Sequence, residues 1–417
     1  MRRLLRFSAF LLVPALSAVT PLIAIPAITA TAGATGWEAY ALGLAIGSAA
    51  CTLVELGWPL TGPQRVAAEL PGHRWVTLIS SVRTRLLALI VLAPLAMGLA
   101  GVLTWNVSAD YVATAVLMAL ASTTTGLSGN WYFIGVGRPV RILTSDALPK
   151  AVLIVAASMA VLAGAPLEVV PAGYLLAATI SPIASLLLAR HERESVARFT
   201  LADDLRVIRL QRSAMGARSI SALYIALPVT LVALFAPAAL ATFAAAERLM
   251  RMALTILQAV PNMLQNWLGS AISPAERRHR VLRSIALNSA IGLASGLAFT
   301  LVTPWASNLL FSGTVEVEWQ LAALAGVVLA LVCVSRATGS LALVRYGWVN
   351  AITASALAAA IVGVPMICLL AAIAGAAGAF VGEILAEVTA ISVQVGALVV
   401  AMDRDRRPFD GGRHRAR

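Results

Sequence analysis

Residues 351–401 read AITASALAAAIVGVPMICLLAAIAGAAGAFVGEILAEVTAISVQVGALVVA, and within this stretch only Glu383 and Glu387 carry a charge. A helix needs about 20 predominantly apolar residues to cross the hydrocarbon core of a bilayer. The stretch is long enough for two crossings. It therefore predicts two successive membrane helices, over 349–371 and 376–401, with both glutamates inside the second.

Apolar runs of the same kind recur along the rest of the 417-residue chain. We expect twelve membrane helices, the other ten lying at about 7–30, 38–60, 86–105, 111–135, 142–163, 169–189, 214–235, 238–267, 284–304 and 319–345. The longest polar stretch, 190–213, predicts a cytoplasmic linker between a bundle of six helices over 1–189 and a second over 214–401. A basic tail follows over 402–417, and the sequence thus predicts an all-α polytopic membrane protein.

The composition supports this fold class. Hydrophobic residues make up 60% of the chain and charged residues 12%, and the mean hydropathy is +0.87. Soluble domains are about 45–50% apolar and about 25% charged. These values exclude a soluble enzyme and a disordered protein. The net charge of +12 does not indicate a nucleic-acid partner, because the basic residues lie between apolar runs rather than on one face.

The basic residues predict the orientation, since cytoplasmic connections are enriched in Lys and Arg. Counted from the N-terminus, alternate connections hold Arg2, Arg3 and Arg6; Arg65, Arg74, Arg83 and Arg85; Arg138, Arg141 and Lys150; seven arginines from Arg190 to Arg218; Arg277, Arg278, Arg280 and Arg283; Arg345; and the tail. The opposite connections hold Glu38, Asp110, Glu168, Glu316 and Glu318 and no basic residue. We therefore expect both termini in the cytoplasm. The arginine and alanine bias is typical of a GC-rich bacterial genome, so the expected location is a bacterial plasma membrane.

No motif for enzymatic or ATP-driven chemistry is present in the sequence. The only lysine, Lys150, lies outside any Walker A pattern, and neither a Gly-x-Ser-x-Gly elbow nor a His-Glu-x-x-His motif occurs. The four histidines lie in basic loops or in the tail, which gives no metal-binding cluster. We expect no enzyme activity, no cofactor and no metal.

Charged residues inside a membrane helix are costly and therefore indicate function. The predicted helix 238–267 contains Glu247, Arg248 and Arg251, and Arg248 lies about ten residues, or about 15 Å, from its outer end. Arginine binds phosphate with two hydrogen bonds and stays charged. These residues form an anion contact in a cavity, or alternatively a Glu–Arg pair that locks helix packing.

The two glutamates of the last helix also have two interpretations. Glu383 and Glu387 lie one turn apart, so each carboxylate disfavours the charge of the other, as does desolvation. They are candidates for carrying a coupling proton or cation. The alternative is a structural bridge to arginines of another helix.

Other polar residues of the predicted helices are weaker candidates. Arg218 and Arg336 either line the cytoplasmic part of a cavity or extend toward the membrane interface. The polar side chains of the fourth helix, Asn130 among them, face a wet cavity or bond within the helix. Glu55, near the cytoplasmic end of the second helix, has a gating role or, as we expect, pairs with Arg65 at the interface.

Small residues spaced four apart predict close helix approach. The pairs are Gly43 and Gly47, Gly292 and Gly296, and Gly378 and Gly382.

Three segments carry a resemblance to a known family. The first runs from Gly36–Tyr40 through Leu56–Trp58 to Arg65, the second is Asn130–Gly135 followed by Arg138, and the third is Phe243–Leu249 followed by Pro261. In this order they resemble the second, fourth and eighth helices of the polysaccharide flippase branch of the multidrug/oligosaccharidyl-lipid/polysaccharide exporter superfamily.

The resemblance implies two six-helix bundles around a central cavity. It implies alternating access, in which a polyprenyl-diphosphate-linked oligosaccharide moves across the membrane for exopolysaccharide or lipopolysaccharide synthesis. Members of the family tend to have cationic cavities, which Arg248 and Arg251 would supply. The implied partners are membrane lipids, a polysaccharide polymerase and glycosyltransferases.

Four alternatives stay open. A major-facilitator carrier shares the six-plus-six plan, but residues 62–69 lack its Gly-x-x-x-Asp-Arg-x-Gly-Arg-Arg signature. A multidrug and toxin exporter would need acidic cation sites in the N-terminal half, where Glu55 and Asp146 are the only candidates. A membrane glycosyltransferase or ligase would need a sizeable external loop. A non-catalytic scaffold of the same pathway would show the same sequence pattern.

Overall fold

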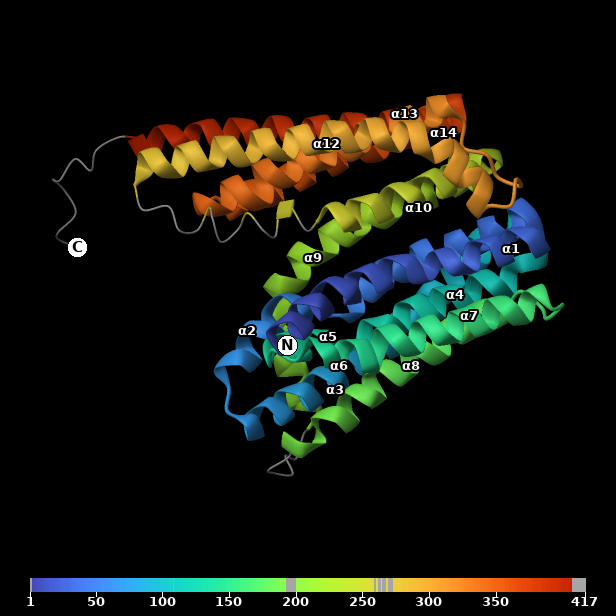
Figure 1. Cartoon of the computed structure of the whole chain (residues 1–417), viewed down its shortest axis with the longest axis horizontal. Coiled ribbons are helices and arrows are strands. Elements are labelled where there is room, and N and C mark those ends of the chain that lie inside the picture. The colour runs from blue at the N-terminus through green and yellow to red at the C-terminus, as the bar shows by residue number, and fades with distance from the viewer. Residues whose placement is uncertain are drawn as a thin grey trace. The chain divides into compact units, whose positions relative to one another are not determined.

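A computed structural model of the chain is almost entirely helical, with no strand in the described ranges (Figure 1). It describes residues 2–107, 109–192, 200–258, 260–261, 264, 268 and 273–406, and their side chains except at 2–22, 60, 64, 68, 71, 139, 192, 210, 212–226, 349 and 406. The α-helices are α1 (Arg2–Val54), α2 (Trp58–Ala68), α3 (Pro71–Trp105), α4 (Val112–Thr124), α5 (Asn130–Gly135), α6 (Pro139–Ile142), α7 (Leu148–Leu162), α8 (Val169–Ala189), α9 (Leu201–Phe235), α10 (Leu240–Leu257), α12 (Pro274–Leu310), α13 (Trp319–Arg336) and α14 (Val349–Arg406). Short 3₁₀ segments are η1 (Ala109–Tyr111), η2 (Thr125–Leu127), η4 (Arg190–Glu192) and η5 (Pro237–Ala239), and π-helical segments are η3 (Leu143–Ala147) and η6 (Ala337–Leu343).

Eight helical segments in the described part of the chain are long and apolar enough to cross a membrane. The multi-pass helical membrane fold predicted from the sequence is thereby confirmed. Two helices are long enough for two crossings: α1 has 53 residues, and α14, at 58 residues, would extend about 87 Å if straight. A kink at Ala374 and Gly375 divides it, and Gly33 divides α1 in the same way. The count of twelve helices stays a prediction.

Helix α3 corrects one predicted boundary. The apolar run predicts a membrane helix that begins at residue 86, but the helix is continuous from Pro71 to Trp105, and the candidate span within it covers Gly72–Trp105. Arg83 and Arg85, which the sequence analysis counted in a loop, therefore lie on the helix. The hydropathy pattern failed here because isolated arginines do not end a helix whose neighbouring elements supply their partners.

The helices form two compact units. Unit 1 comprises Met1–Glu247 and Pro304–Val317, and unit 2 comprises Arg248–Thr303 and Glu318–Arg417. Unit 1 therefore takes in α9 and the start of α10. The domain boundaries expected from the sequence, with 190–213 as a linker, stay a prediction.

Unit 1 packs around α1, which contacts α3, α4, α7 and α9 (Figure 1). Its approach to α4 depends on small residues. A Cβ atom at Gly43 would lie 2.3 Å from the carbonyl oxygen of Ala115, and one at Gly47 would lie 2.5 Å from that of Ala119. In a membrane, helices associate through such backbone proximity because lipid removes the hydrophobic driving force between them.

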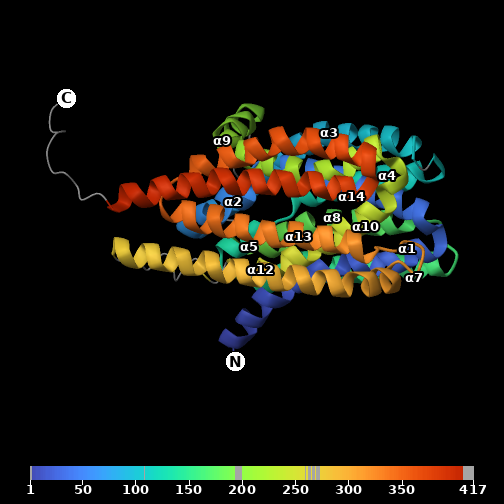
Figure 2. The ribbon, with the colours of Figure 1, turned by 90° about the horizontal axis from the view of Figure 1, so that it is seen from above.

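The main packing in unit 2 is between α13 and α14, which run side by side in Figure 2. Helix α12 approaches α13 where Gly296 faces Gly326, and a Cβ atom on Gly296 would lie 2.5 Å from the Gly326 carbonyl oxygen. Gly378 and Gly382 lie against Leu370 and Ile367 across the kink of α14. The close approaches predicted from all three glycine pairs are therefore confirmed.

The two units share a local design at a spacing of 210 residues. The N–H groups of Gly137 and Arg138 donate to the carbonyl oxygens of Ile134 and Phe133. At the equivalent positions Gly347 and Trp348 donate to Val344 and Leu343, and both glycines have a positive φ. This is the Schellman termination of a helix.

The apolar residues before these two terminations correspond as well. Trp131, Tyr132 and Phe133 belong to the buried cluster of one unit, and Leu341, Ala342 and Leu343 belong to that of the other. The two units therefore repeat the same local arrangement of a buried apolar segment followed by a glycine-terminated helix end.

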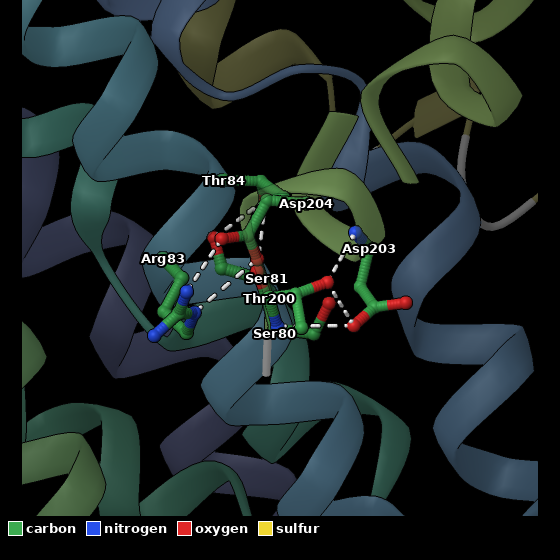
Figure 3. Close-up of polar contacts among 7 residues, drawn as sticks. All are labelled: Ser80, Ser81, Arg83, Thr84, Thr200, Asp203 and Asp204. Carbon is green, nitrogen blue, oxygen red and sulfur yellow. Dashed lines mark hydrogen bonds and ion pairs between the residues drawn. The ribbon is translucent and has the colours of Figure 1, made fainter. Parts of the chain in front are cut away.

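The start of α9 is fastened to α3 within unit 1 (Figure 3). Arg83 forms a bidentate ion pair with Asp204, with Nε–Oδ1 and Nη2–Oδ2 distances of 3.2 and 2.7 Å. Asp204 is 2% exposed. At the N-terminus of α9, the N-cap residue Thr200 and Asp203 form a reciprocal helix cap. The hydrogen bonds from Thr200 lower the pKa of Asp203. The polar segment between the halves is therefore anchored rather than loose where it enters α9.

We predict that Gly43→Ala destabilises the protein by about 1–3 kcal/mol, because the added methyl group must displace the α4 backbone. The matched control is Gly98→Ala on α3, where a Cβ atom meets nothing within 4 Å. There the change should be neutral or stabilising by up to about 1 kcal/mol through helix propensity. Thermal unfolding of both variants in the same detergent checks the contrast, and equal melting temperatures would contradict the packing argument.

We predict that Asp204→Arg lowers the free energy of unfolding by about 1–3 kcal/mol, since the new buried arginine would face the partly solvated Arg83 with the same charge. The compensating exchange Arg83→Asp with Asp204→Arg should recover part of the loss. Arg206→Asp is the control, because Arg206 is exposed on the same helix. Melting temperatures of the four proteins measure the coupling, and an exchange no better than Asp204→Arg alone would show that the pair does not fasten α9.

Candidate functional site

A buried polar cluster lies in unit 2 where α13 continues into the π-helical segment η6. Gln394 of α14 accepts a hydrogen bond from the Thr338 hydroxyl and donates to Ser355 and Ser335, at 3.1 and 3.4 Å. Gly339 leaves room for this amide, because a Cβ atom there would lie 3.1 Å from Nε2 of Gln394. The amide of Gln394 therefore links η6 to both halves of α14.

Arg336 closes α13 beside this cluster. Its Nη1 donates to the Leu254 carbonyl oxygen of α10 at 2.8 Å, and its side chain is partly buried. Arg336 also interacts electrostatically with Arg251 of α10 and Glu387 of α14. Arg336 is thus within electrostatic range of two other residues predicted from the sequence, and we call the three the arginine group (Arg251, Arg336 and Glu387).

The composition of the arginine group determines its chemistry. Two guanidinium groups repel one another, and in a medium of low dielectric constant this repulsion is strong. Glu387, which is 6% exposed, offsets part of it. An arrangement that holds two arginines close together favours an anionic ligand, and guanidinium groups match the oxygen atoms of a phosphate.

The other predicted residues of α10 differ from one another. Glu247 is buried, 4% exposed, and takes part in polar contacts. Arg248 is partly exposed and makes no hydrogen bond or ion pair with any other described residue. Both interpretations of these residues, an anion contact and a Glu–Arg pair, stay predictions.

Glu383 lies one turn before Glu387 on α14 and is 3% exposed. Both carboxylates take part in polar or electrostatic interactions within the described structure. Glu387 lies within electrostatic range of Arg336, and the structural bridge considered from the sequence stays a prediction. The role of the two glutamates in ion coupling stays a prediction.

Asn130 lies apart from the arginine group, in unit 1. It opens α5, and its Nδ2 donates to Oδ2 of Asp146 in η3 at 2.6 Å, while its Oδ1 is buried without a hydrogen-bond partner among the described residues. Arg218 lies on α9, but its side chain is outside the described residues. No group of three or more His, Cys, Asp and Glu residues that could hold a metal occurs in the described ranges.

Sequence reasoning missed two kinds of site residue. Gln394, Thr338 and Ser355 are single polar residues in apolar runs, and a glutamine in the last membrane helix was the available signal. Arg85 was counted as a loop residue, yet it is 1% exposed on α3. The expected Glu55–Arg65 pair is wrong: Arg65 pairs with Glu69 at 2.9 Å, and Glu55 interacts electrostatically with Arg85.

We predict that Gln394→Leu destabilises the protein by about 1–2 kcal/mol, because it leaves the buried Thr338 and Ser355 hydroxyls with one partner fewer. In the Gln394→Leu background, Thr338→Val should lower the stability by less than it does in the wild-type protein, since the two side chains share one hydrogen bond. Thermal unfolding of the single and double variants measures this coupling. Strictly additive losses would contradict the shared contact, and Ser392→Ala on the exposed side of α14 serves as the control.

The chain was compared with known proteins by sequence and by structure. No family model and no curated protein matches the sequence. Among solved structures, the lipid II flippase MurJ in an inward closed conformation is similar with a TM-score of 0.71 and 8% identity, over 96% of this chain and 90% of that one.

Two multidrug and toxin extrusion (MATE) transporters are also similar. One, in the bent conformation, has a TM-score of 0.56 and 14% identity over 94% of each chain. The other, the eukaryotic MATE transporter AtDTX14, has a TM-score of 0.52 and 13% identity over 96% of each chain. These likenesses establish the fold alone: the chain folds like the MurJ flippase and like these two MATE transporters.

Proposed function

We propose that the protein moves a polyprenyl-diphosphate-linked oligosaccharide across a bacterial plasma membrane by alternating access. The observation that carries the proposal is the arginine group, in which Arg251 and Arg336 from two helices lie within electrostatic range inside an apolar unit. A diphosphate supplies the negative charge that two neighbouring guanidinium groups require. Arg248 adds donors that no described residue uses.

The fold is compatible with such a substrate. The similar structure with the highest TM-score given above is named as a flippase of lipid II, a lipid-linked molecule. A lipid-linked diphosphate needs a cationic polar site and no nucleophile, which agrees with the absence of hydrolase and ATP-binding motifs from the sequence. We infer that the product serves exopolysaccharide or lipopolysaccharide synthesis, together with a polymerase and glycosyltransferases.

The remaining predicted residues take roles within this proposal. Glu247 orients the arginines of α10, and Arg218 lies on the cytoplasmic side of the pathway. Asn130 contacts sugar hydroxyl groups through its carbonyl oxygen. Glu383 and Glu387 respond to the coupling ion. The substrate pathway would lie in a central cavity between two six-helix bundles, with both termini in the cytoplasm.

A multidrug exporter is the second candidate, because MATE transporters share the fold. Export of organic cations calls for acidic side chains free to meet the drug. In unit 1 the two acidic candidates have basic or amide partners: Glu55 interacts with Arg85, and Asp146 accepts from Asn130. The buried pair Glu383 and Glu387 is the feature that favours cation transport. The charge of the arginine group favours the anionic substrate.

We predict that replacing both Arg251 and Arg336 by Gln slows translocation by about 100-fold or more, since each lost charged hydrogen bond is worth about 1.5–3 kcal/mol. The test is mass spectrometry of polyprenyl-diphosphate-linked glycans in a deletion strain without a second flippase for the same glycan, complemented by each variant. Arg278→Gln is the matched control, because Arg278 is exposed on α12.

The glycan pool separates the alternatives. Accumulation of complete repeat units with the double variant, and not with Arg278→Gln, supports the proposal. Truncated units would indicate a glycosyltransferase, and an unchanged pool together with drug sensitivity would move the assignment to multidrug export.

A further inference from the structure

Arg85 is the most deeply buried arginine in the described part of the chain. It is 1% exposed and lies 14 residues after the start of α3, or about 21 Å along the helix. A buried guanidinium stays charged, and burying a charge is costly unless it is paired and hydrogen-bonded. The contacts of Arg85 must therefore repay that cost.

Those contacts are made to a break in the fourth membrane segment. Helix α4 ends at Thr124, a 3₁₀ turn covers Thr125–Leu127, and α5 starts only at Asn130. A break of this kind releases backbone carbonyl groups from helical hydrogen bonds. Within a membrane such groups need a partner from the protein, because no water reaches them from the lipid.

Arg85 supplies that partner. Its Nη1 donates to the carbonyl oxygens of Gly126 at 2.9 Å and Ser128 at 2.7 Å. Its Nε donates to the Ser81 carbonyl oxygen of its own helix at 3.1 Å, which fixes the direction of the side chain. One side chain thus joins α3 to both ends of the break.

The surroundings hold the guanidinium in place. Glu55 interacts electrostatically with the guanidinium group of Arg85. The Cζ atom of Arg85 lies 6.0 Å from the centre of the Trp131 ring. The break itself is packed on two sides: a Cβ atom at Gly126 would lie 2.9 Å from the Cys51 carbonyl oxygen, and one at Gly129 would lie 2.5 Å from Ser185. The broken segment therefore has steric limits, and Arg85 provides its polar link to α3.

The residue that follows the break is Asn130. It donates to Asp146 in the π-helical segment η3, so a second irregular helix depends on where the break places it. Arg85, the broken segment, Asn130 and Asp146 form one continuous chain of hydrogen bonds and backbone through unit 1.

We propose that Arg85 is a positioning residue that fixes the break at Thr125–Gly129, holds Asn130 on Asp146 and so presents the Asn130 carbonyl oxygen to the transported glycan. The last step rests on the proposed function. The first two steps concern the fold of unit 1 alone and can be tested without any substrate.

The test is amide hydrogen exchange of the full-length protein in detergent. Arg85→Met should raise exchange at Asn130, Trp131 and Tyr132 by about tenfold, since the carbonyl groups of the break lose their donor. Arg85→Lys should give a smaller increase, because a single ammonium cannot reproduce the fixed fork of donors. The matched control is Arg83→Met, two residues away, which should affect exchange near Asp204 and leave the break unchanged.

If Arg85→Met does not fold, the Lys variant decides. Unchanged exchange at Asn130–Tyr132 in a folded Arg85 variant would overturn the proposal, as would equal increases throughout unit 1. A local increase confined to the break and η3 supports it.

A transport measurement separates the two levels of the proposal. In vesicles supplied with the lipid-linked glycan, Arg85→Lys and Asn130→Ala should each reduce the initial rate, and the double variant should be no slower than Asn130→Ala. Additive losses would overturn the role of Arg85 in presenting Asn130. A wild-type protein that moves no lipid-linked glycan would overturn the proposed function. The hydrogen-exchange experiment would still test whether Arg85 fixes the break and holds Asn130 on Asp146.

Discussion

Every backbone polar group inside a membrane must find its partner within the protein, and the rest of this structure depends on that requirement. Regular helices satisfy it without help, which is why the described chain consists of almost nothing else. At three interruptions in the described chain, a nearby side chain or a turn supplies the missing hydrogen bonds. Arg85 bonds the carbonyl groups of the broken fourth segment, and the Schellman turns at Gly137 and Gly347 close two other helix ends.

The same requirement explains where the irregular segments lie. The 3₁₀ turn η2 and the π-helical segments η3 and η6 each adjoin a polar side chain from another element. Asn130 reaches η3, and Gln394 reaches η6. π-Helical turns are frequent at functional sites, because they widen the helix and alter the direction of its side chains. In both units the polar contacts and the irregular backbone therefore belong to one local design.

Charge follows a different logic from backbone polarity. An arginine within a membrane helix is costly, so it needs either a compensating contact or a function. Arg85 has the contacts of a structural residue: two carbonyl groups of the break, a neighbouring glutamate and an aromatic ring. Arg336 donates to a carbonyl oxygen of α10 and lies within electrostatic range of Arg251 and of Glu387. This difference is the reason for assigning the first to the fold and the other two to an anionic substrate.

The sequence alone determined the class of protein. Long apolar runs with few charges permit only membrane helices, and the location of arginine between the runs set the expected orientation. It also identified Gly43 and Gly47 as a packing surface, and Arg251, Arg336 and Glu387 as candidate site residues. The fold class and the glycine packing are confirmed, because they depend on residue type and on local spacing, which are properties of one helix at a time. The orientation and the site residues stay predictions.

Only the tertiary structure decided which of these residues meet. The arginine group combines α10, α13 and α14, elements that lie far apart in the sequence, and no local pattern states that their side chains converge. Arg85 was misplaced for the same reason. Hydropathy counts it as a charge at the end of a run, whereas its burial depends on carbonyl groups that a break 41 residues later releases. A partner supplied by another helix determines the cost of burying a charge, and that partner is known only once the helices are packed.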